Sequence, residues 1–192
     1  MVGRMLWHKG VADFVAAARR VRQVFPGTVF VLVGPSDPGN PAQVPPEELR
    51  AWEAEGVVRY LGVRDDVRDL LAAADVAVLP SYREGIPRVL IEAAAMGRPL
   101  VATDVPGCRE VIRDGINGFL VPAKDPAALA AAIEALLKDP GLRAEFGAAS
   151  RRLAEERFSD RKVVARILGL YAELLSAKSI PLPQGFTGAG LP

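Results

Sequence analysis

Short β-branched apolar runs alternate with amphipathic segments, and this alternation restricts the fold of the 192-residue chain more than any other feature. The runs are bounded by turn residues and predict buried strands of a parallel sheet. The segments between them repeat apolar residues every three or four positions, as helices packed on a sheet do. We therefore predict an α/β fold, a Rossmann-like doubly wound parallel sheet. The predicted strands cover residues 28–34, 57–62, 76–81, 99–103 and 118–122.

Both ends of the chain depart from this alternation. Met1 and Val2 predict the end of a further strand, which brings the predicted strands to about six. This incomplete strand suggests that the chain is half of a larger enzyme. After residue 122 the pattern is helical only, and the last predicted helix is more apolar than a surface helix needs. It packs either on the sheet or against a further domain. The predicted helices cover residues 11–25, 46–55, 66–74, 87–96 and 108–113, then a segment from 125, 142–157 and 161–175.

Composition and charge limit the functional classes. Lys and Arg number 24 and Asp and Glu 23, with no basic tract, which excludes a general nucleic-acid binder. No apolar run reaches the ~18 residues of a membrane-spanning helix. One cysteine, Cys108, leaves no disulfide within the chain and fits a reducing cytoplasm. We expect a domain over residues 1–178 and a loose tail, rich in Pro and Gly, over 179–192.

The turn around Glu84 joins a predicted strand to a predicted helix. Ligands of doubly wound sheets bind beyond the carboxyl ends of the strands, where a helix start offers free N–H groups to a phosphate. Gly85 lets a ligand approach the backbone. Glu84 and Glu92 could accept hydrogen bonds from the hydroxyls of a nucleotide-sugar. From spacing alone, two ordinary surface carboxylates are the simpler interpretation.

Two cations, Arg4 and Lys9, follow the first predicted strand. Arg holds phosphate oxygens bidentately and Lys acts as a point charge, so the pair could neutralise a departing diphosphate. Solvated surface cations are the alternative. The patterns of a P-loop and of a nicotinamide-dinucleotide fingerprint are both absent.

Taken in order, the motifs resemble one family. Over about residues 1–175 the chain is similar to the C-terminal domain of the family-four retaining glycosyltransferases, which have the GT-B fold. The motifs that carry this resemblance are, in order, VGRMLWHKGV, FVLVG, VRYLGVRDDVRDLLAAADVAVLPS, YREGIPRVLIEAAAMGRPLVATDVPGCREVI and DGINGFLVP. The resemblance implies transfer of a hexose, with retention, from a nucleoside diphosphate sugar, expected to be UDP-linked, to an acceptor hydroxyl. It also implies surface polysaccharide or lipid-linked glycan synthesis, with a glycan or lipid-linked sugar as acceptor.

By this resemblance, Arg4 and Lys9 bind the diphosphate, Glu84 contacts the sugar and Glu92 the ribose, as the ends of an E-x7-E motif. Many members have small apolar residues where this chain has Pro87 and Arg88, so the role of Arg88 is open. The remaining residues expected to line the donor cleft are Gly3, Gly34, Arg64, Gly85, Ile86, Pro87 and Arg88.

Three tempting features, two single residues and one acidic pair, have simpler explanations. His8, the only histidine, is expected in a loop near the cleft, and Cys108 as a small packed residue. Asp65 and Asp66 could bind a metal, but capping of the next helix is simpler. We expect no metal and no cofactor.

The acceptor-binding domain of a GT-B enzyme is expected before Met1. The enzyme is expected in the cytoplasm, where this domain would reach the inner face of the membrane. The isolated chain is then expected to bind a nucleotide-sugar weakly without turnover. Two rival functions remain: a nucleotide-sugar binding module completed by a partner chain, and a non-hydrolysing sugar-nucleotide epimerase. The single histidine disfavours the epimerase.

Overall fold

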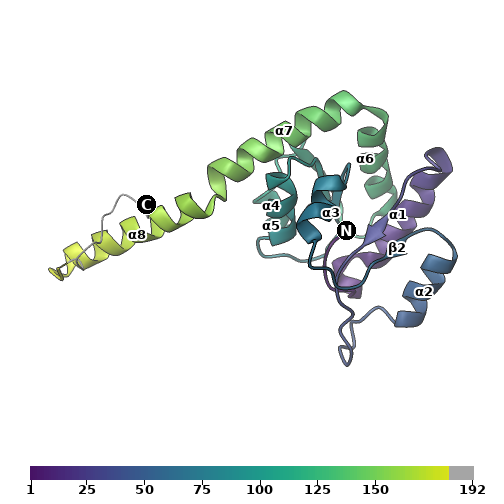
Figure 1. The fold of residues 1–192 in the computed structure, drawn as a ribbon, viewed down its shortest axis with the longest axis horizontal. Coiled ribbons are helices and arrows are strands. Elements are labelled where there is room, and N and C mark those ends of the chain that lie inside the picture. The colour runs from purple at the N-terminus through teal and green to yellow at the C-terminus, as the bar shows by residue number, and fades with distance from the viewer. Residues whose placement is uncertain (182–192) are drawn as a thin grey trace.

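Parallel strands lie between helices in the computed structural model, which describes residues 1–181 (Figure 1). The predicted α/β class is confirmed. The elements are the 3₁₀ helix η1 (Trp7–Lys9), α1 (Val11–Val24), β1 (Val31–Leu32), α2 (Pro46–Ala54), β2 (Arg59–Tyr60), α3 (Val67–Ala73), β3 (Ala77–Leu79), α4 (Arg88–Ala95), β4 (Leu100–Thr103), α5 (Pro106–Arg109), β5 (Gly118–Val121), α6 (Pro126–Lys138), α7 (Pro140–Arg157) and α8 (Asp160–Ala177).

The strands form two hydrogen-bonded groups where one sheet of about six strands was predicted. β1 pairs with β2, and β4 lies between β3 and β5, all in parallel. Val2 adds a parallel bridge to Val33, so the predicted first strand is represented by a single bridge. The strands are also shorter than the apolar runs, because a strand extends only as far as its neighbours pair with it.

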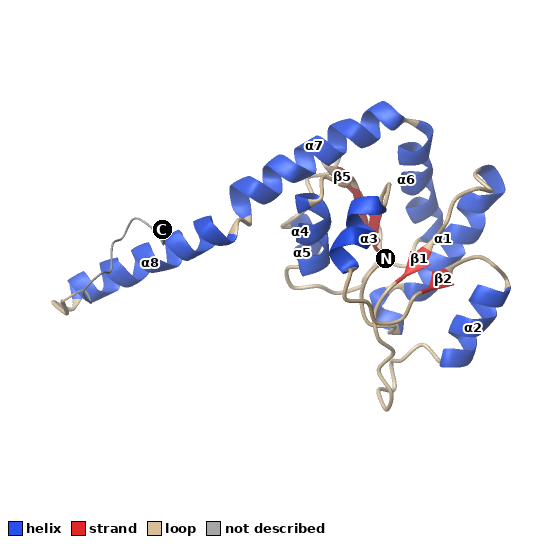
Figure 2. Ribbon diagram, in the orientation of Figure 1, coloured by secondary structure: helices blue, strands red, loops and turns tan. Residues whose placement is uncertain are grey.

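Side chains of neighbouring strand residues enter different cores. Val78 and Val101 pack with buried residues of α1 and α6, whereas Ala77, Leu79 and Leu100 pack with those of α3, α4 and α5. This alternation follows from the two-residue period of a strand. Helices therefore cover both faces of the strands, as a doubly wound fold requires (Figure 2).

The last helix, α8, extends away from the rest of the molecule (Figure 1). None of its residues is buried, and large apolar side chains on it are 42–54% exposed. Packing of this helix on the sheet, one of the two interpretations, is therefore wrong. No helix among residues 1–181 is both long and apolar enough to cross a bilayer. Most of the predicted tail, residues 182–192, lies outside the described residues. The exposed apolar residues of α8 are Val163, Ile167, Leu170, Tyr171 and Leu174.

Two of the helix starts are capped by carboxylates. Asp125 accepts hydrogen bonds from the amides of Ala127 and Ala128 at 3.1 and 2.9 Å, and Asp139 accepts one from Leu142 at 2.9 Å. Capping of α3 by Asp65 or Asp66 is not observed. Asp66 occupies the N-cap position of α3 without a capping hydrogen bond.

Glycines allow two backbone approaches that shape the loops at the carboxyl ends of the strands. Gly10 has a φ of 74°, and a Cβ atom there would overlap the Pro80 carbonyl that follows β3. Gly107, in α5, lies against the backbone of Glu84 and Gly85, and a Cβ atom there would overlap the Gly85 carbonyl. The loop that carries Glu84 is therefore held between α5 and the N-terminal segment.

We predict that Gly107→Ala destabilises the protein by about 2 kcal/mol, because the added methyl group displaces the 84–85 backbone. Urea unfolding measures this change. Gly169→Ala is the matched control, since nothing lies within 4 Å of a Cβ atom at this position of α8. Unfolding midpoints that agree between Gly107→Ala and the unmodified chain would show that the loop adjusts freely.

Candidate functional site

Lys9 and Glu84 meet beyond the carboxyl end of β3. The Tyr82 amide donates a hydrogen bond to the His8 carbonyl at 2.9 Å, which ties the loop after β3 to η1. Lys9 Nζ then lies 2.7 Å from Glu84 Oε1, and these side chains are only 20% and 12% exposed. An ammonium group has three donors, so Lys9 can hold Glu84 and a second acceptor at once.

The N-terminus of α4 begins four residues after Glu84. Pro87 occupies its N-cap position, no side chain caps it, and its first turn contains no acidic residue. Gly85 and Ile86 are exposed, and the space next to the Gly85 Cα is open. The free N–H groups and the positive end of the helix dipole can therefore receive an anionic group next to the Lys9–Glu84 pair.

Arg4 is paired with a residue that the sequence did not single out. Its Nη1 atom lies 3.0 Å from Oδ2 of Asp37, in the Pro-rich loop after β1, and its side chain is 54% exposed. The loop is ordered by the N-terminal segment: the Met5 amide donates to Pro35 and the Trp7 amide to Ala42. Among the described residues, no hydrogen bond or ion pair joins Arg4 to Lys9 or Glu84.

Gly3 and Gly34 lie against each other. The Gly3 amide donates to the Val33 carbonyl at 2.8 Å, and a Cβ atom on Gly34 would overlap the Gly3 carbonyl. The Gly34 amide donates to Gly62 at 2.7 Å, and its carbonyl accepts from the Tyr60 hydroxyl at 2.9 Å. The two glycines thus join the ends of the first strands.

Arg64, Arg88 and Glu92 are placed at the surface. Arg64 pairs with Asp66 at 2.7 Å. Arg88, whose side chain is 90% exposed, lies 3.7 Å from Glu92, four residues along α4. Glu92 also lines a hollow that α4 shares with Arg151 of α7 and the start of α8. Within residues 1–181, no hydrogen bond or ion pair links Glu92 to Glu84.

Cys108 is a packed residue, as predicted. It is fully buried in α5, and burial, reinforced by the nearby charge of Glu84, raises the pKa of its thiol to about 12. The thiol therefore stays protonated at neutral pH and is a poor nucleophile. No group of three or more His, Cys, Asp or Glu side chains in the described part of the chain could hold a metal ion.

Two residues that shape the site were not predicted. Gly107 supports the Glu84 loop, and Asp37 holds Arg4. The Pro106–Gly107 dipeptide, a typical turn signal, could have drawn attention to Gly107. For Asp37, an acidic residue in a Pro-rich loop carries no such signal.

Comparison with known proteins gives a consistent assignment. Residues 1–139 match the model of the family described as glycosyl transferases group 1. The chain is 35% identical, over 91% of its length, to the N,N'-diacetylbacillosaminyl-diphospho-undecaprenol alpha-1,3-N-acetylgalactosaminyltransferase of Campylobacter jejuni, of which it spans 44%. It is 32% identical, over 95% of its length, to the glycogen synthase of Mycobacterium tuberculosis, again spanning 44%.

Solved structures agree with these relatives. The Anabaena HepE protein in complex with UDP superposes with a TM-score of 0.77 and 30% identity, over 92% of this chain and 48% of that one. The sucrose-phosphate synthase of Thermosynechococcus elongatus superposes with a TM-score of 0.80 and 31% identity, over 92% and 45% of the two chains.

The chain spans about half the length of the relatives that it matches. The matched half is the C-terminal one, with the Rossmann-like fold of GT-B glycosyltransferases. The chain therefore belongs to the group 1 glycosyltransferases, of which it represents the C-terminal half.

Proposed function

We propose that this chain is the donor-binding domain of a retaining glycosyltransferase and that it binds a UDP-linked hexose. The observation that supports this most is the position of the partly buried Lys9–Glu84 pair beside the uncapped N-terminus of α4. This arrangement offers positive charge for a diphosphate and a carboxylate for sugar hydroxyls within one loop cluster. UDP is the preferred nucleotide because the Anabaena HepE structures contain UDP and UDP-glucose.

In this proposal Lys9 and the first amides of α4 bind the diphosphate. Lys9 keeps its hydrogen bond to Glu84 and directs its remaining donors to phosphate oxygens. Arg4 exchanges Asp37 for a phosphate oxygen, which its exposed side chain permits. Exposed Arg88 can turn from Glu92 toward the same group.

Glu84 and Glu92 are assigned to the two ends of the donor. Glu84, held by Lys9 and supported by Gly107, accepts hydrogen bonds from the transferred sugar. Glu92 accepts hydrogen bonds from the ribose. Gly3 and Gly34 bring the backbone close to the nucleotide, and Arg64 borders the base.

Charge develops on the diphosphate oxygens as the glycosidic bond to the donor breaks. Fixed positive groups that meet this charge lower the barrier, and they act most strongly where water is excluded. Lys9 is the best placed of the cations, since it is the least exposed and its direction is fixed by Glu84. We assign the transfer itself, to an acceptor glycan or lipid-linked sugar, to the assembled enzyme.

A second domain completes the site in this proposal. The relatives are about twice as long as this chain, and α8 carries an apolar face that nothing among the described residues covers. An acceptor-binding domain that closes over the nucleotide would exclude water from the diphosphate and could contact α8. We assign this acceptor-binding domain to the half of the relatives that the present chain does not match.

A nucleotide panel tests donor binding. We expect UDP and UDP-sugars to raise the unfolding temperature of the chain more than GDP or ADP derivatives do. Lys9→Gln should raise the dissociation constant for UDP about tenfold or more, because a charge-assisted hydrogen bond to phosphate is lost. Lys138→Gln, at an exposed position on α6, is the matched control. Equal UDP affinity in the two variants would remove Lys9 from the site.

Glu92 provides a second test by calorimetry. Glu92→Ala should lower the affinity for UDP about tenfold, because two ribose hydroxyls lose their acceptor. It should lower the affinity for a 2′,3′-dideoxy analogue much less. Glu145→Ala is the control, because it removes an exposed carboxylate of α7. An equal loss for UDP and the dideoxy analogue would place Glu92 away from the ribose.

A further inference from the structure

The side chain of Tyr82 lies between two charged residues that have no part in the proposed donor binding. Tyr82 follows β3 and comes two residues before Glu84. Its hydroxyl lies beside the Asp13 carboxylate of α1, and Lys124 Nζ lies 5.2 Å from the centre of its ring. We name these three residues, Asp13, Tyr82 and Lys124, the tyrosine clamp. The clamp brings together the start of α1, the loop after β3 and the loop after β5.

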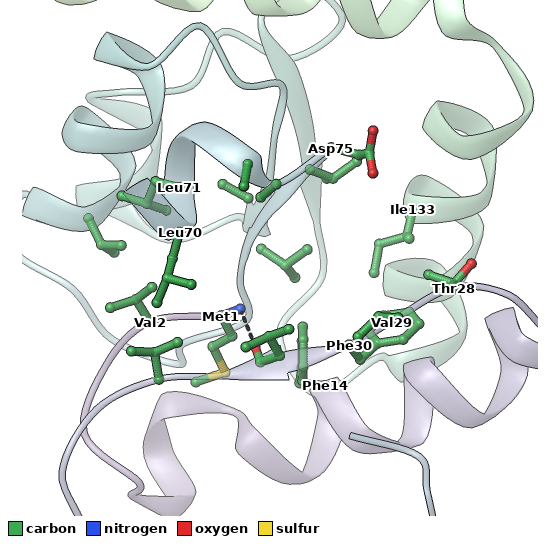
Figure 3. Close-up of a pocket in the computed structure, with 18 of the residues that line it drawn as sticks. Met1, Val2, Phe14, Thr28, Val29, Phe30, Leu70, Leu71, Asp75 and Ile133 are labelled. Atoms are coloured by element: carbon green, nitrogen blue, oxygen red, sulfur yellow. Dashed lines mark hydrogen bonds between the residues drawn. The ribbon is translucent and has the colours of Figure 1, made fainter. Parts of the chain in front are cut away.

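Asp13 lies where a carboxylate is costly without a donor. It belongs to the first turn of α1, next to Phe14, whose ring lines an apolar cavity between β1 and β3 (Figure 3). Its Oδ2 atom is buried and accepts no hydrogen bond of standard geometry within residues 1–181. The Tyr82 hydroxyl is a donor beside this carboxylate, and burial together with Asp13 raises the pKa of Tyr82 to about 12. The hydroxyl therefore keeps its proton for Asp13 at neutral pH.

Lys124 occupies a position that disfavours lysine in two ways. Its φ of 63° lies in the left-handed region, which costs free energy in most residues other than glycine. It also precedes Asp125, the N-cap of α6, so its charge lies near the positive end of a helix dipole. The contact of its ammonium with the Tyr82 ring compensates for these costs. A backbone outlier that is kept in this way indicates a function for its side chain.

The tyrosine clamp is connected to the Lys9–Glu84 pair on both sides. The Tyr82 amide donates to the carbonyl of His8, the residue before Lys9, at 2.9 Å. Glu84, two residues after Tyr82, accepts the hydrogen bond from Lys9 at 2.7 Å. The main chain and the side chain of Tyr82 are thus both held by the segment that carries Lys9. A shift of Tyr82 would move one partner of the pair relative to the other.

We propose that Tyr82 is a positioning residue for the donor diphosphate, held by Asp13 through its hydroxyl and by Lys124 through its ring. It acts through Lys9 and Glu84, whose relative position it fixes, because groups that bind a phosphate lose strength when they are misplaced. The role in donor binding rests on the proposed function. The hold of the clamp on the Tyr82–His8 contact exists without a nucleotide.

Replacement of Lys124 separates positioning from mere tolerance of a surface lysine. Lys124→Gly relaxes the left-handed backbone, so an idle side chain predicts unchanged UDP affinity. The clamp predicts a dissociation constant for UDP that is about three- to fivefold higher, as expected for one lost cation–π contact, and recovery in Lys124→Arg. Ser179→Gly is the matched control, because it relaxes the other non-glycine residue with a positive φ within residues 1–181.

A double-mutant cycle shows whether the effect passes through Lys9. In a Lys9→Gln chain, Lys124→Gly should change the dissociation constant for UDP less than about 1.5-fold, because the group that the clamp positions is gone. A general structural weakening would lower the affinity equally in both backgrounds. Equal losses with and without Lys9 would therefore overturn the positioning role.

Amide hydrogen exchange tests the clamp without a nucleotide. The Tyr82 amide should exchange at least about threefold faster in the Lys124→Gly chain than in the Ser179→Gly chain. Unchanged exchange at Tyr82 would overturn the clamp itself. Faster exchange with unchanged UDP affinity would overturn its role in donor binding. If the unmodified chain binds no UDP, the proposed function and the positioning role both fail, and exchange at Tyr82 still decides whether the clamp holds the loop.

Discussion

The contact between the N-terminal segment and the end of β3 is the constraint on which the site depends. The Tyr82–His8 hydrogen bond and the close approach of Gly10 to Pro80 fix two loops that are about 70 residues apart in the sequence. Lys9 and Glu84 can meet in a partly buried ion pair only because their backbones are held in this way. A buried pair is costly unless its geometry is fixed in advance, so backbone packing comes before chemistry here.

Every cation assigned to the donor already has a carboxylate partner. Lys9 is paired with Glu84, Arg4 with Asp37, and Arg88 with Glu92. Binding of a diphosphate therefore exchanges the partners of Arg4 and Arg88 and adds phosphate contacts to the Lys9–Glu84 pair, so its electrostatic gain is a difference between two sets of contacts. Exposed pairs such as Arg4–Asp37 contribute little and release their cation readily, whereas Lys9 is released at greater cost. This difference favours Lys9 as the fixed element and Arg4 as the adaptable one.

The sequence predicted elements better than it predicted contacts. Strand and helix positions followed from periodicity. The expected capping of α3 by Asp65 or Asp66 is not observed, whereas the caps that do form, Asp125 and Asp139, were not predicted. Lys9 and Glu84 could be assigned to one edge because carboxyl ends of parallel strands share it. The support of Glu84 by Gly107 depends on packing between loops, which periodicity does not describe. Whether α8 is exposed could not be decided from the sequence either, because an apolar face has the same pattern whether or not a partner covers it.

Both tryptophans of the chain lie in the region of η1 and α2. Trp7 belongs to η1, two residues before Lys9, and its ring meets that of Trp52 edge to face, with centroids 6.3 Å apart. Trp7 is 37% exposed and Trp52 8%. Indole emission therefore originates from the η1–α2 region and not from α7 or α8. Its spectrum is an intrinsic optical reporter of the segment that holds Lys9, readable without a label.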